Sequence, residues 1–506
     1  MNADHGNSPA GSIDLADVQG LLRFGYKHHT ESAFALLRVK DRAAARAWLG
    51  AAPVATAAPG QPPATILQLA LSAEGLRALG VDDEVMQAFA AEFVAGLGTD
   101  ANRSRRLGDV GVNDPSQWRW GGPASDQVPH VLALAYALPG RLAGFADALQ
   151  AQWDDAFELM HWLPTADMGG VEPFGFADGI SQPDIDWSRS IPARDEDRLV
   201  YGNLSCLGEF LLGYPNEYGR YTSRPLLDPT AAAAALPRAE DAPGRADLGR
   251  NGSYLVLRSL RQDVAGFWRH LDAQANGDEA QRKRLAEAMV GRRMDGQPLV
   301  PPAADPIAGV GADDASRRMN GFTFDDDPAG LGCPVGAHIR RSNPRNADLP
   351  PGARGLLSRA ARILGFAGAP SLHADAVASA RFHRVLRRGR EYGERISMAA
   401  ALSEQPPAAE SGLHFVCLCA DLERQFEFVQ GAWIAGTKFA GLPHESDPLL
   451  GNRHAAPGEP DTARFSIPRA GCPTRVLEGL PPFVSVIGGA YFFLPGVRAL
   501  RYLATA

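Results

Sequence analysis

One local pattern recurs along the chain: a short apolar or β-branched run is followed by an amphipathic stretch with helical spacing. The clearest copies cover residues 32–49 and 253–271. In each copy an arginine lies in the run and a tryptophan follows ten residues later, namely Arg38 with Trp48 and Arg258 with Trp268. Short β-branched runs favour strands, and apolar positions three or four residues apart favour helices. Each copy therefore predicts a strand followed by a helix.

Similar units occur in both halves of the chain, over residues 64–80, 130–149, 413–433 and 483–503. Such a recurrence indicates a duplicated α+β domain. The alternative for alternating strands and helices is a parallel, doubly wound sheet. Two features speak against it: no GxGxxG motif follows a strand, and we expect the run at 483–494 to be followed at once by a second strand, as in an antiparallel hairpin. We therefore expect an α+β fold of two ferredoxin-like domains, each a β-α-β-β-α-β unit with an antiparallel sheet.

We place the boundary between the two domains where a Gly/Pro-rich stretch ends. The N-terminal domain then covers residues 1–184, and the C-terminal domain covers residues 185–506. Residues 346–380 are expected to be an insertion in the second domain. The basic helical stretch within it is more typical of a solvated surface than of a binding site.

Composition and charge are typical of a soluble globular protein. Of the 506 residues, 45% are hydrophobic and 21% are charged, and the length exceeds one ordinary domain of ~100–200 residues. The formal net charge is −8 and no basic stripe is present, so we expect no nucleic-acid partner. The apolar runs are too short to span a bilayer, and the N-terminus has no signal-peptide pattern, so we expect no membrane segment.

The cysteines indicate a cytoplasmic protein with reduced thiols, because five is an odd and small number for a disulfide scaffold. Cys417 and Cys419 would share one face of a strand. Two thiols without further ligands are nevertheless a weak signal for a metal site.

Three short motifs carry candidate chemistry. The first is GFADGISQP, residues 175–183, in which Gly175 and Gly179 bracket Asp178. Glycine permits unusual backbone dihedrals, or lets a flat ligand approach the chain closely. Because Asp-Gly is a common turn dipeptide, this motif alone is more often a plain turn than a site.

The second motif is GCPVGAHIRRSNPR, residues 332–345, where His338 is followed by Arg340, Arg341 and Arg345. A neutral imidazole is the usual protein ligand of haem iron. The guanidinium fork of arginine matches carboxylates, such as the two propionates of a porphyrin. A single histidine on a basic strand is more often structural, so this motif too is modest by itself.

The third motif is HRVLRRGREYG, residues 383–393, with Arg387 and Arg388 at the end of an apolar run. Surface charge explains most arginine pairs. The weight of the three motifs comes from their combination and their order along the chain.

In this order the motifs resemble those of the dye-decolourising peroxidase family. The GxxDG motif together with the downstream GAHIRR…NPR segment is a specific combination. The resemblance covers nearly the whole chain, and it includes the segments DVQGLLRFGY at 17–26, DLERQFEFVQGAW at 421–433 and FVSVIGGAYFFLPGVRALRYL at 483–503.

The resemblance implies two ferredoxin-like domains of the dimeric α+β barrel type. It also implies one haem b per chain, bound without a covalent link and mainly by the second domain. Carried over by position, His338 is the iron ligand, and Asp447 accepts a hydrogen bond from its other ring nitrogen. Arg345 matches a partner of a haem propionate. Gly175 and Gly179 become candidate contacts of the cofactor.

For function, the resemblance implies a peroxidase that reduces hydrogen peroxide and oxidises bulky aromatic donors, such as dyes and phenols, through a ferryl intermediate. Peroxide must lose a proton from one oxygen and gain one on the other, which is a task for Asp178. Arg387 stabilises the negative charge that develops. A carboxyl group with a pKa of about 3.9 predicts an acidic working range.

The alternative function is a haem-binding or haem-handling protein that removes iron from the porphyrin with little peroxidase turnover. Both functions need His338, but only the peroxidase needs Asp178 and Arg387 together. The sequence does not determine the oligomeric state, and a homo-oligomer is one expectation.

A buried haem is out of reach for bulky donors, so electrons would leave it through oxidisable side chains. The candidates are Trp162, Trp187, Trp268, Trp433, Tyr392 and Tyr491. Aromatic side chains more often serve packing, and the sequence does not rank these six. The insertion at 346–380 would cover the haem edge or the protein surface.

Overall fold

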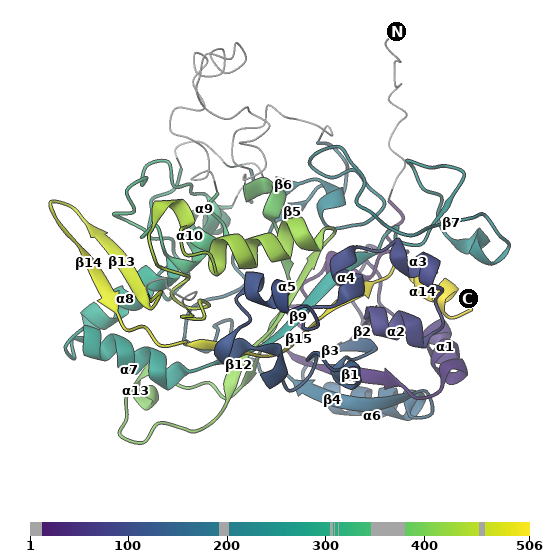
Figure 1. The fold of residues 1–506 in the computed structure, drawn as a ribbon, viewed down its shortest axis with the longest axis horizontal. Coiled ribbons are helices and arrows are strands. Elements are labelled where there is room, and N and C mark those ends of the chain that lie inside the picture. Colours follow the sequence, from purple (N-terminus) through teal and green to yellow (C-terminus); the bar gives the residue numbers. More distant parts are fainter. Residues whose placement is uncertain are drawn as a thin grey trace, which may run out of the picture.

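The computed structural model describes residues 13–191, 202–303, 307, 309–311, 313–345, 380–454 and 461–505. A nine-stranded antiparallel sheet runs through the middle of the molecule, with helices packed around it (Figure 1). The predicted insertion at 346–380 lies outside the described residues, apart from Ala380. No helix in the described part of the chain is long and apolar enough to cross a membrane.

The first half of the sheet is one ferredoxin-like unit. Its elements are β1 (Glu31–Val39), α1 (Arg42–Ala51), β2 (Thr65–Leu71), β3 (Val131–Ala137), α6 (Leu142–Trp153) and β4 (Phe157–Pro164). The strands lie in the order β2-β3-β1-β4, and each neighbouring pair is antiparallel. Four short helices fill the connection from β2 to β3: α2 (Ala73–Ala78), α3 (Asp83–Gln87), α4 (Ala91–Ala95) and α5 (Ala101–Leu107).

The second half repeats this arrangement. Its elements are β9 (Ser253–Gln262), α7 (Val264–Gln274), β10 (Leu386–Arg387), β11 (Arg390–Gly393), β12 (Ser411–Cys419) and β15 (Val484–Leu494), with two π-helical segments after β12, η8 (Leu422–Glu427) and η9 (Val429–Ile434). The strand order β10-β12-β9-β15 is again antiparallel. The two halves become one sheet where β15 pairs with β2, at Phe493 and Leu71. The predicted fold of two ferredoxin-like units is confirmed.

The recurring strand–helix pattern is also confirmed, and its helices begin in the same way. The side chain of Asp41 accepts a hydrogen bond of 2.7 Å from the N–H of Ala44 at the start of α1. Asp263 does the same for Gly266 at the start of α7, at 2.8 Å. Such caps satisfy backbone donors that have no partner inside the helix. Trp48 and Trp268 are both buried in these helices.

The prediction for the end of the chain was wrong in one detail. No second strand follows β15, because the chain turns at Pro495 into the helix α14 (Val497–Leu503). Apolar residues at helical spacing in α14 are buried, and Arg501 donates hydrogen bonds to backbone carbonyls at the end of α1. The last helix of the second unit therefore packs on the first helix of the first unit.

The remaining strands and α-helices of the described residues, together with one 3-10 helix, lie in the connections. They are β5 (Asp184–Ile185), β6 (Leu204–Ser205), β7 (Leu226–Leu227), β8 (Ala246–Asp247), α8 (Glu279–Val290), α9 (Asp314–Asn320), α10 (His338–Ser342), η7 (Ala380–His383), α13 (Met398–Ala401), β13 (Arg464–Arg469) and β14 (Cys472–Glu478). The predicted domain boundary at 184/185 passes through β5 and stays a prediction.

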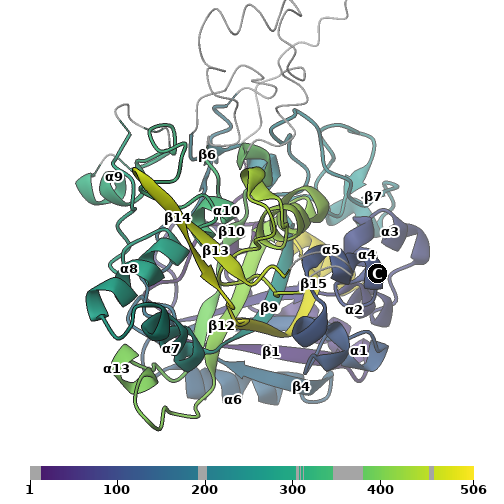
Figure 2. The same ribbon diagram turned by 60° about the vertical axis from the view of Figure 1, so that its left-hand side comes forward.

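The two faces of the second unit's sheet differ: one borders a large cavity and the other packs on an apolar core. Along β12, Leu413 and Phe415 face a large cavity, whereas Val416 and Leu418 belong to the apolar core on the opposite face. Both views show α10 and the yellow-green π-helical segments on the same side of the sheet (Figure 1, Figure 2). The cavity therefore lies between β9 and β12 on one side and these helices on the other.

Candidate active site

The large cavity brings together residues from all three sequence motifs. Its volume is about 290 Å³. Asp178 reaches it from the first motif, His338 and Arg345 from the second, and Arg387 from the third. Leu413, Phe415 and other apolar side chains form much of the remaining wall.

His338 begins the short helix α10, and its orientation is fixed by Asp447. The ring Nδ1 lies 2.9 Å from Oδ2 of Asp447. The other carboxylate oxygen of Asp447 accepts the backbone N–H groups of Leu449 and Leu450, at 2.9 and 2.8 Å. A carboxylate only accepts hydrogen bonds, so Nδ1 carries the proton and Nε2 is left as a ligating nitrogen.

The Asp447 carboxylate is completely buried. Burial acts to raise the pKa of Asp447, but the nearby His338 and the N–H of Leu450 outweigh this effect, and the pKa is lowered. An ionised carboxylate on Nδ1 increases the basicity of the imidazole at its other nitrogen. The arrangement is therefore that of a metal-ligating histidine with its supporting acid.

Asp178 and Arg387 face each other across a looser contact. Nη1 of Arg387 lies 3.3 Å from Oδ1 of Asp178, and the two side chains are 36% and 35% exposed. Enclosure acts to raise the pKa of Asp178, but the Arg387 guanidinium and the N–H of Gly179 outweigh this, so the pKa is lowered. Asp178 is therefore an ionised carboxylate beside a fixed cation.

The first and third motifs are bound to each other directly. The side-chain oxygen of Gln182 accepts the backbone N–H of Arg387 at 2.9 Å. The carbonyl of Ser181 accepts Nη2 of Arg387 at 3.2 Å. The residues that follow Asp178 in the motif thus hold Arg387 in place.

Gly175 and Gly179 shape this loop rather than contact the cavity. Their φ angles are 99° and 70°, in the region that favours glycine. Neither glycine is among the residues that line the cavity. The structure therefore supports a conformational role for them in carrying Asp178, and their contact with a cofactor stays a prediction.

The three arginines of the second motif have different surroundings. Arg341 is fully buried and donates to the backbone carbonyls of Trp433, Gly436 and Glu445. Arg340 donates to the carboxylate of Asp327. These two are structural.

Arg345 lines the cavity and stacks on Phe322, with its guanidinium carbon 3.7 Å from the ring centroid. Arg292 lies over Phe322 as well, at 5.4 Å, and also lines the cavity. Two arginines thus approach one edge of the cavity. Sequence reasoning missed Arg292, which lies outside the three motifs.

The chain was compared with known proteins. No family model matches it. Among curated proteins, it is 27% identical to a dye-decolorizing peroxidase of Mycetinis scorodonius, over 98% of this chain and 88% of that protein. It is 28% identical to the multifunctional dye peroxidase of an Amycolatopsis species, over 86% and 82%.

A fungal DyP-type peroxidase from Auricularia auricula-judae has a solved structure with a TM-score of 0.70, at 25% identity, over 98% of this chain and all of that chain. The chain is similar to DyP-type peroxidases over nearly its whole length. A DyP-type peroxidase from Anabaena, at 21% identity and a TM-score of 0.68, shares the fold.

One acidic residue of the cavity was missed by sequence reasoning. Glu172 lines the cavity six residues before Asp178. Its carboxylate accepts the N–H groups of Phe174 and Phe176, both at 3.0 Å, and the side chain of Gln262 at 2.8 Å. Burial raises the pKa of Glu172 to about 7 in spite of these donors. The only sequence signal was an acid three residues before the first glycine of the GxxDG motif.

Among the six aromatic residues proposed for electron transfer, Trp433 is the one that lines the cavity. It makes edge contacts with His383 and Phe428, at centroid distances of 5.2 and 5.3 Å. His383 also lines the cavity, but its Nδ1 donates to the carbonyl of Arg424 and its ring stacks on Phe428. Both rings are thus held by packing around the cavity.

Proposed function

We propose that the protein is a haem b-dependent peroxidase that reduces hydrogen peroxide and oxidises bulky aromatic donors, such as dyes and phenols, at acidic pH. One observation carries the proposal: the His338–Asp447 pair and the Asp178–Arg387 pair reach the same cavity. Similarity to dye-decolorizing peroxidases over nearly the whole chain supports an oxidoreductase that acts on peroxide.

The residues of the cavity suit a haem group. His338 offers Nε2 as an iron ligand, because Nδ1 is engaged by Asp447. Apolar side chains from β12 would cover a porphyrin face, and Arg345 and Arg292 would meet its propionates at one edge. One solved structure similar to this chain is a dye-decolorizing peroxidase with an engineered heme pocket. When bound, the haem would supply the redox chemistry with peroxide.

Asp178 would move the proton. Its carboxylate would take a proton from one oxygen of hydrogen peroxide and return it to the other, which prepares the O–O bond for heterolysis. The lowered pKa keeps Asp178 ionised in mild acid, so it remains able to accept this proton there. A histidine in the same place would already be protonated.

Arg387 would orient peroxide and stabilise the negative charge that develops as its O–O bond polarises. Its guanidinium group donates hydrogen bonds in a fixed, planar arrangement. Its fixed contacts with Gln182 and Ser181 mean that little reorganisation is needed. Asp178 and Arg387 thus divide proton transfer and charge stabilisation between them.

The test compares the protein with an Asp178→Asn/Arg387→Leu double variant, both loaded with haem. We expect both to show a Soret band, and the double variant to lose peroxide-dependent dye oxidation. Equal dye oxidation by both proteins would refute the proposed roles. Release of iron from haem by both proteins, with no peroxide-dependent turnover in either, would instead establish the haem-handling alternative.

A further inference from the structure

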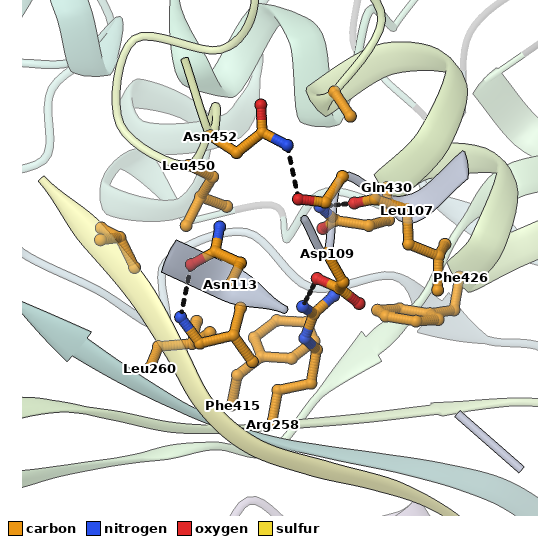
Figure 3. Close-up of a pocket in the computed structure, with 14 residues that line it drawn as sticks. Leu107, Asp109, Asn113, Arg258, Leu260, Phe415, Phe426, Gln430, Leu450 and Asn452 are labelled. Carbon is orange, nitrogen blue, oxygen red and sulfur yellow. Dashed lines mark hydrogen bonds and ion pairs between the residues drawn. The ribbon is translucent and has the colours of Figure 1, made fainter. Parts of the chain in front are cut away.

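A second, smaller chamber lies next to the large cavity (Figure 3). Its volume is about 50 Å³. Six residues line both spaces and form the wall between them: Leu260, Phe415, Phe426, Gln430, Leu450 and Val484. The chamber therefore adjoins the proposed haem site without being part of it.

The chamber contains a buried ion pair. Arg258 of β9 donates from Nη2 to Oδ1 of Asp109, and their side chains are only 3% and 1% exposed. Arg258 is the strand arginine that the repeated sequence pattern singled out. Figure 3 shows its guanidinium pointing toward the Asp109 carboxylate inside the chamber.

Three atoms of this pair have no hydrogen-bond partner in the described part of the structure: Oδ2 of Asp109, and Nε and Nη1 of Arg258. A buried polar atom without a partner costs roughly 1–3 kcal/mol, and more if it is charged. Burial raises the pKa of Asp109 to about 6 even with Arg258 beside it, so protein groups alone solvate the carboxylate poorly. Such a pair calls for a further partner.

The amides around the chamber hold its walls in place. Asn113 accepts the N–H of Val486 at 2.9 Å. Gln430 and Asn452 donate to backbone carbonyls of the segment that precedes Asp109. None of these bonds reaches the three atoms of the ion pair that have no partner.

We propose that this chamber binds small neutral molecules that carry O–H groups, namely water and hydrogen peroxide. Such a molecule donates to Oδ2 of Asp109 and accepts from Nε or Nη1 of Arg258. A free anion would be repelled by the carboxylate and a free cation by the guanidinium. The volume accommodates about three water molecules, or one hydrogen peroxide with less water.

The chamber lies beside the large cavity and could therefore supply hydrogen peroxide to it. This part of the proposal, the binding of hydrogen peroxide, rests on the proposed function. Peroxide held here would be one wall away from Asp178 and Arg387. The side chains of that wall are mostly apolar, and Gln430 is the polar member. The chamber would thus raise the local supply of peroxide without taking part in its chemistry.

A crystal structure of the haem-loaded enzyme at high resolution tests the binding site itself. We expect ordered density within hydrogen-bond distance of Oδ2 of Asp109 and of Nε or Nη1 of Arg258. An empty chamber with well-ordered walls would overturn the proposal. This experiment does not depend on peroxidase turnover, so its failure is distinguishable from failure of the proposed function.

Kinetics separate the two ligands. An Asp109→Leu/Arg258→Met variant removes both charges together. With hydrogen peroxide as oxidant, we expect the second-order rate constant to fall by about three- to tenfold. With tert-butyl hydroperoxide, which is too large for the chamber, we expect no change. An unchanged rate with hydrogen peroxide, together with ordered density, would establish water as the ligand and support the site in that form.

A matched control uses another buried ion pair. Arg224 and Asp247 are 3% and 0% exposed and do not line either space. An Arg224→Met/Asp247→Leu variant should therefore leave both peroxide rate constants unchanged. Equal losses of the rate constant in the two variants, or equal losses with both oxidants, would point to general destabilisation. Either result would overturn the proposal that the chamber binds hydrogen peroxide. The crystal structure of the wild type keeps the site testable if a variant fails to fold.

Discussion

Two aspartates of the same cavity differ sharply in how they are held. Asp447 is completely buried and accepts three hydrogen bonds, each of 2.8–2.9 Å. Asp178 is 35% exposed and meets Arg387 at 3.3 Å. Both pKa values are lowered. The difference lies in freedom: Asp447 is fixed as a permanent acceptor for His338, whereas Asp178 is accessible enough to exchange a proton with a ligand.

The largest effect is expected for the His338–Asp447 pair. His338→Ala should remove the iron ligand, so haem retention should fall to below about a tenth of the wild-type level. The Soret band after gel filtration measures this, and far-UV circular dichroism checks that the variant is folded. A folded variant with near-normal haem content would contradict the assignment of His338.

Asp447→Asn tests the supporting acid in the same pair. An amide cannot provide the negative charge that increases the basicity of His338, and it accepts fewer hydrogen bonds. We expect a loss of about 10–100-fold in haem affinity or activity. Asp178→Asn is the matched control, because it should leave haem affinity unchanged. Similar losses of haem in both variants would remove the distinction between the two aspartates.

Variants of the Asp178–Arg387 pair should change the rate of the reaction with peroxide. Arg387→Leu should slow this reaction by more than about tenfold, which corresponds to ~1.4 kcal/mol of barrier. Asp178→Asn should slow it less, because water can relay protons in a partly exposed site. Stopped-flow mixing with peroxide measures both rates. Wild-type rates in both variants would show that the pair does not act on peroxide.

The lowered pKa of Asp178 keeps its carboxylate able to accept a proton in acid. Because the overall reduction of peroxide consumes protons, dye oxidation should be fastest at roughly pH 3–5. Folded-state pKa values below the unfolded ones contribute stability that is lost as the pH falls through them, and this applies to Asp178 and Asp447. Initial rates must therefore be measured together with the Soret band. An optimum at pH 7 or above, with haem retained at pH 4, would count against Asp178.

The smallest effect is expected for Glu172, whose shift has the opposite sign. Its pKa is raised to about 7 in the folded protein. The folded state therefore binds more protons than the unfolded state, and stability falls as the pH rises from about 4.5 to about 7. In Glu172→Gln, the free energy of unfolding should therefore fall by roughly 1–3 kcal/mol less over this pH range than in the wild type. Urea unfolding at pH 5 and pH 7 measures it, and an identical pH dependence in the variant would contradict the raised pKa.

Local patterns were enough to predict the strand–helix units and the residues that meet at the cavity. Asp178, His338 and Arg387 lie in short motifs whose composition is unusual. Residues whose importance depends on a tertiary neighbour could not be found in this way. Glu172 matters because Gln262 of β9 reaches it, and Asp109 because it lies beside Arg258.

Composition alone also does not separate arginines that face a site from structural ones. The donors of Arg340 and Arg341 are used by Asp327 and by backbone carbonyls. The expected second strand after residue 494 was wrong, because Pro495 ends the pairing and the residues that follow pack as the helix α14 against α1.

The join between β15 and β2 has a consequence for unfolding. β15 pairs with β9 of the second unit and with β2 of the first, and α14 packs on α1. Loss of the pairing of β15 would separate the two halves of the sheet and remove the part of the cavity wall that Val484 contributes. The two units should therefore unfold together, and the cavity should be lost in the same transition.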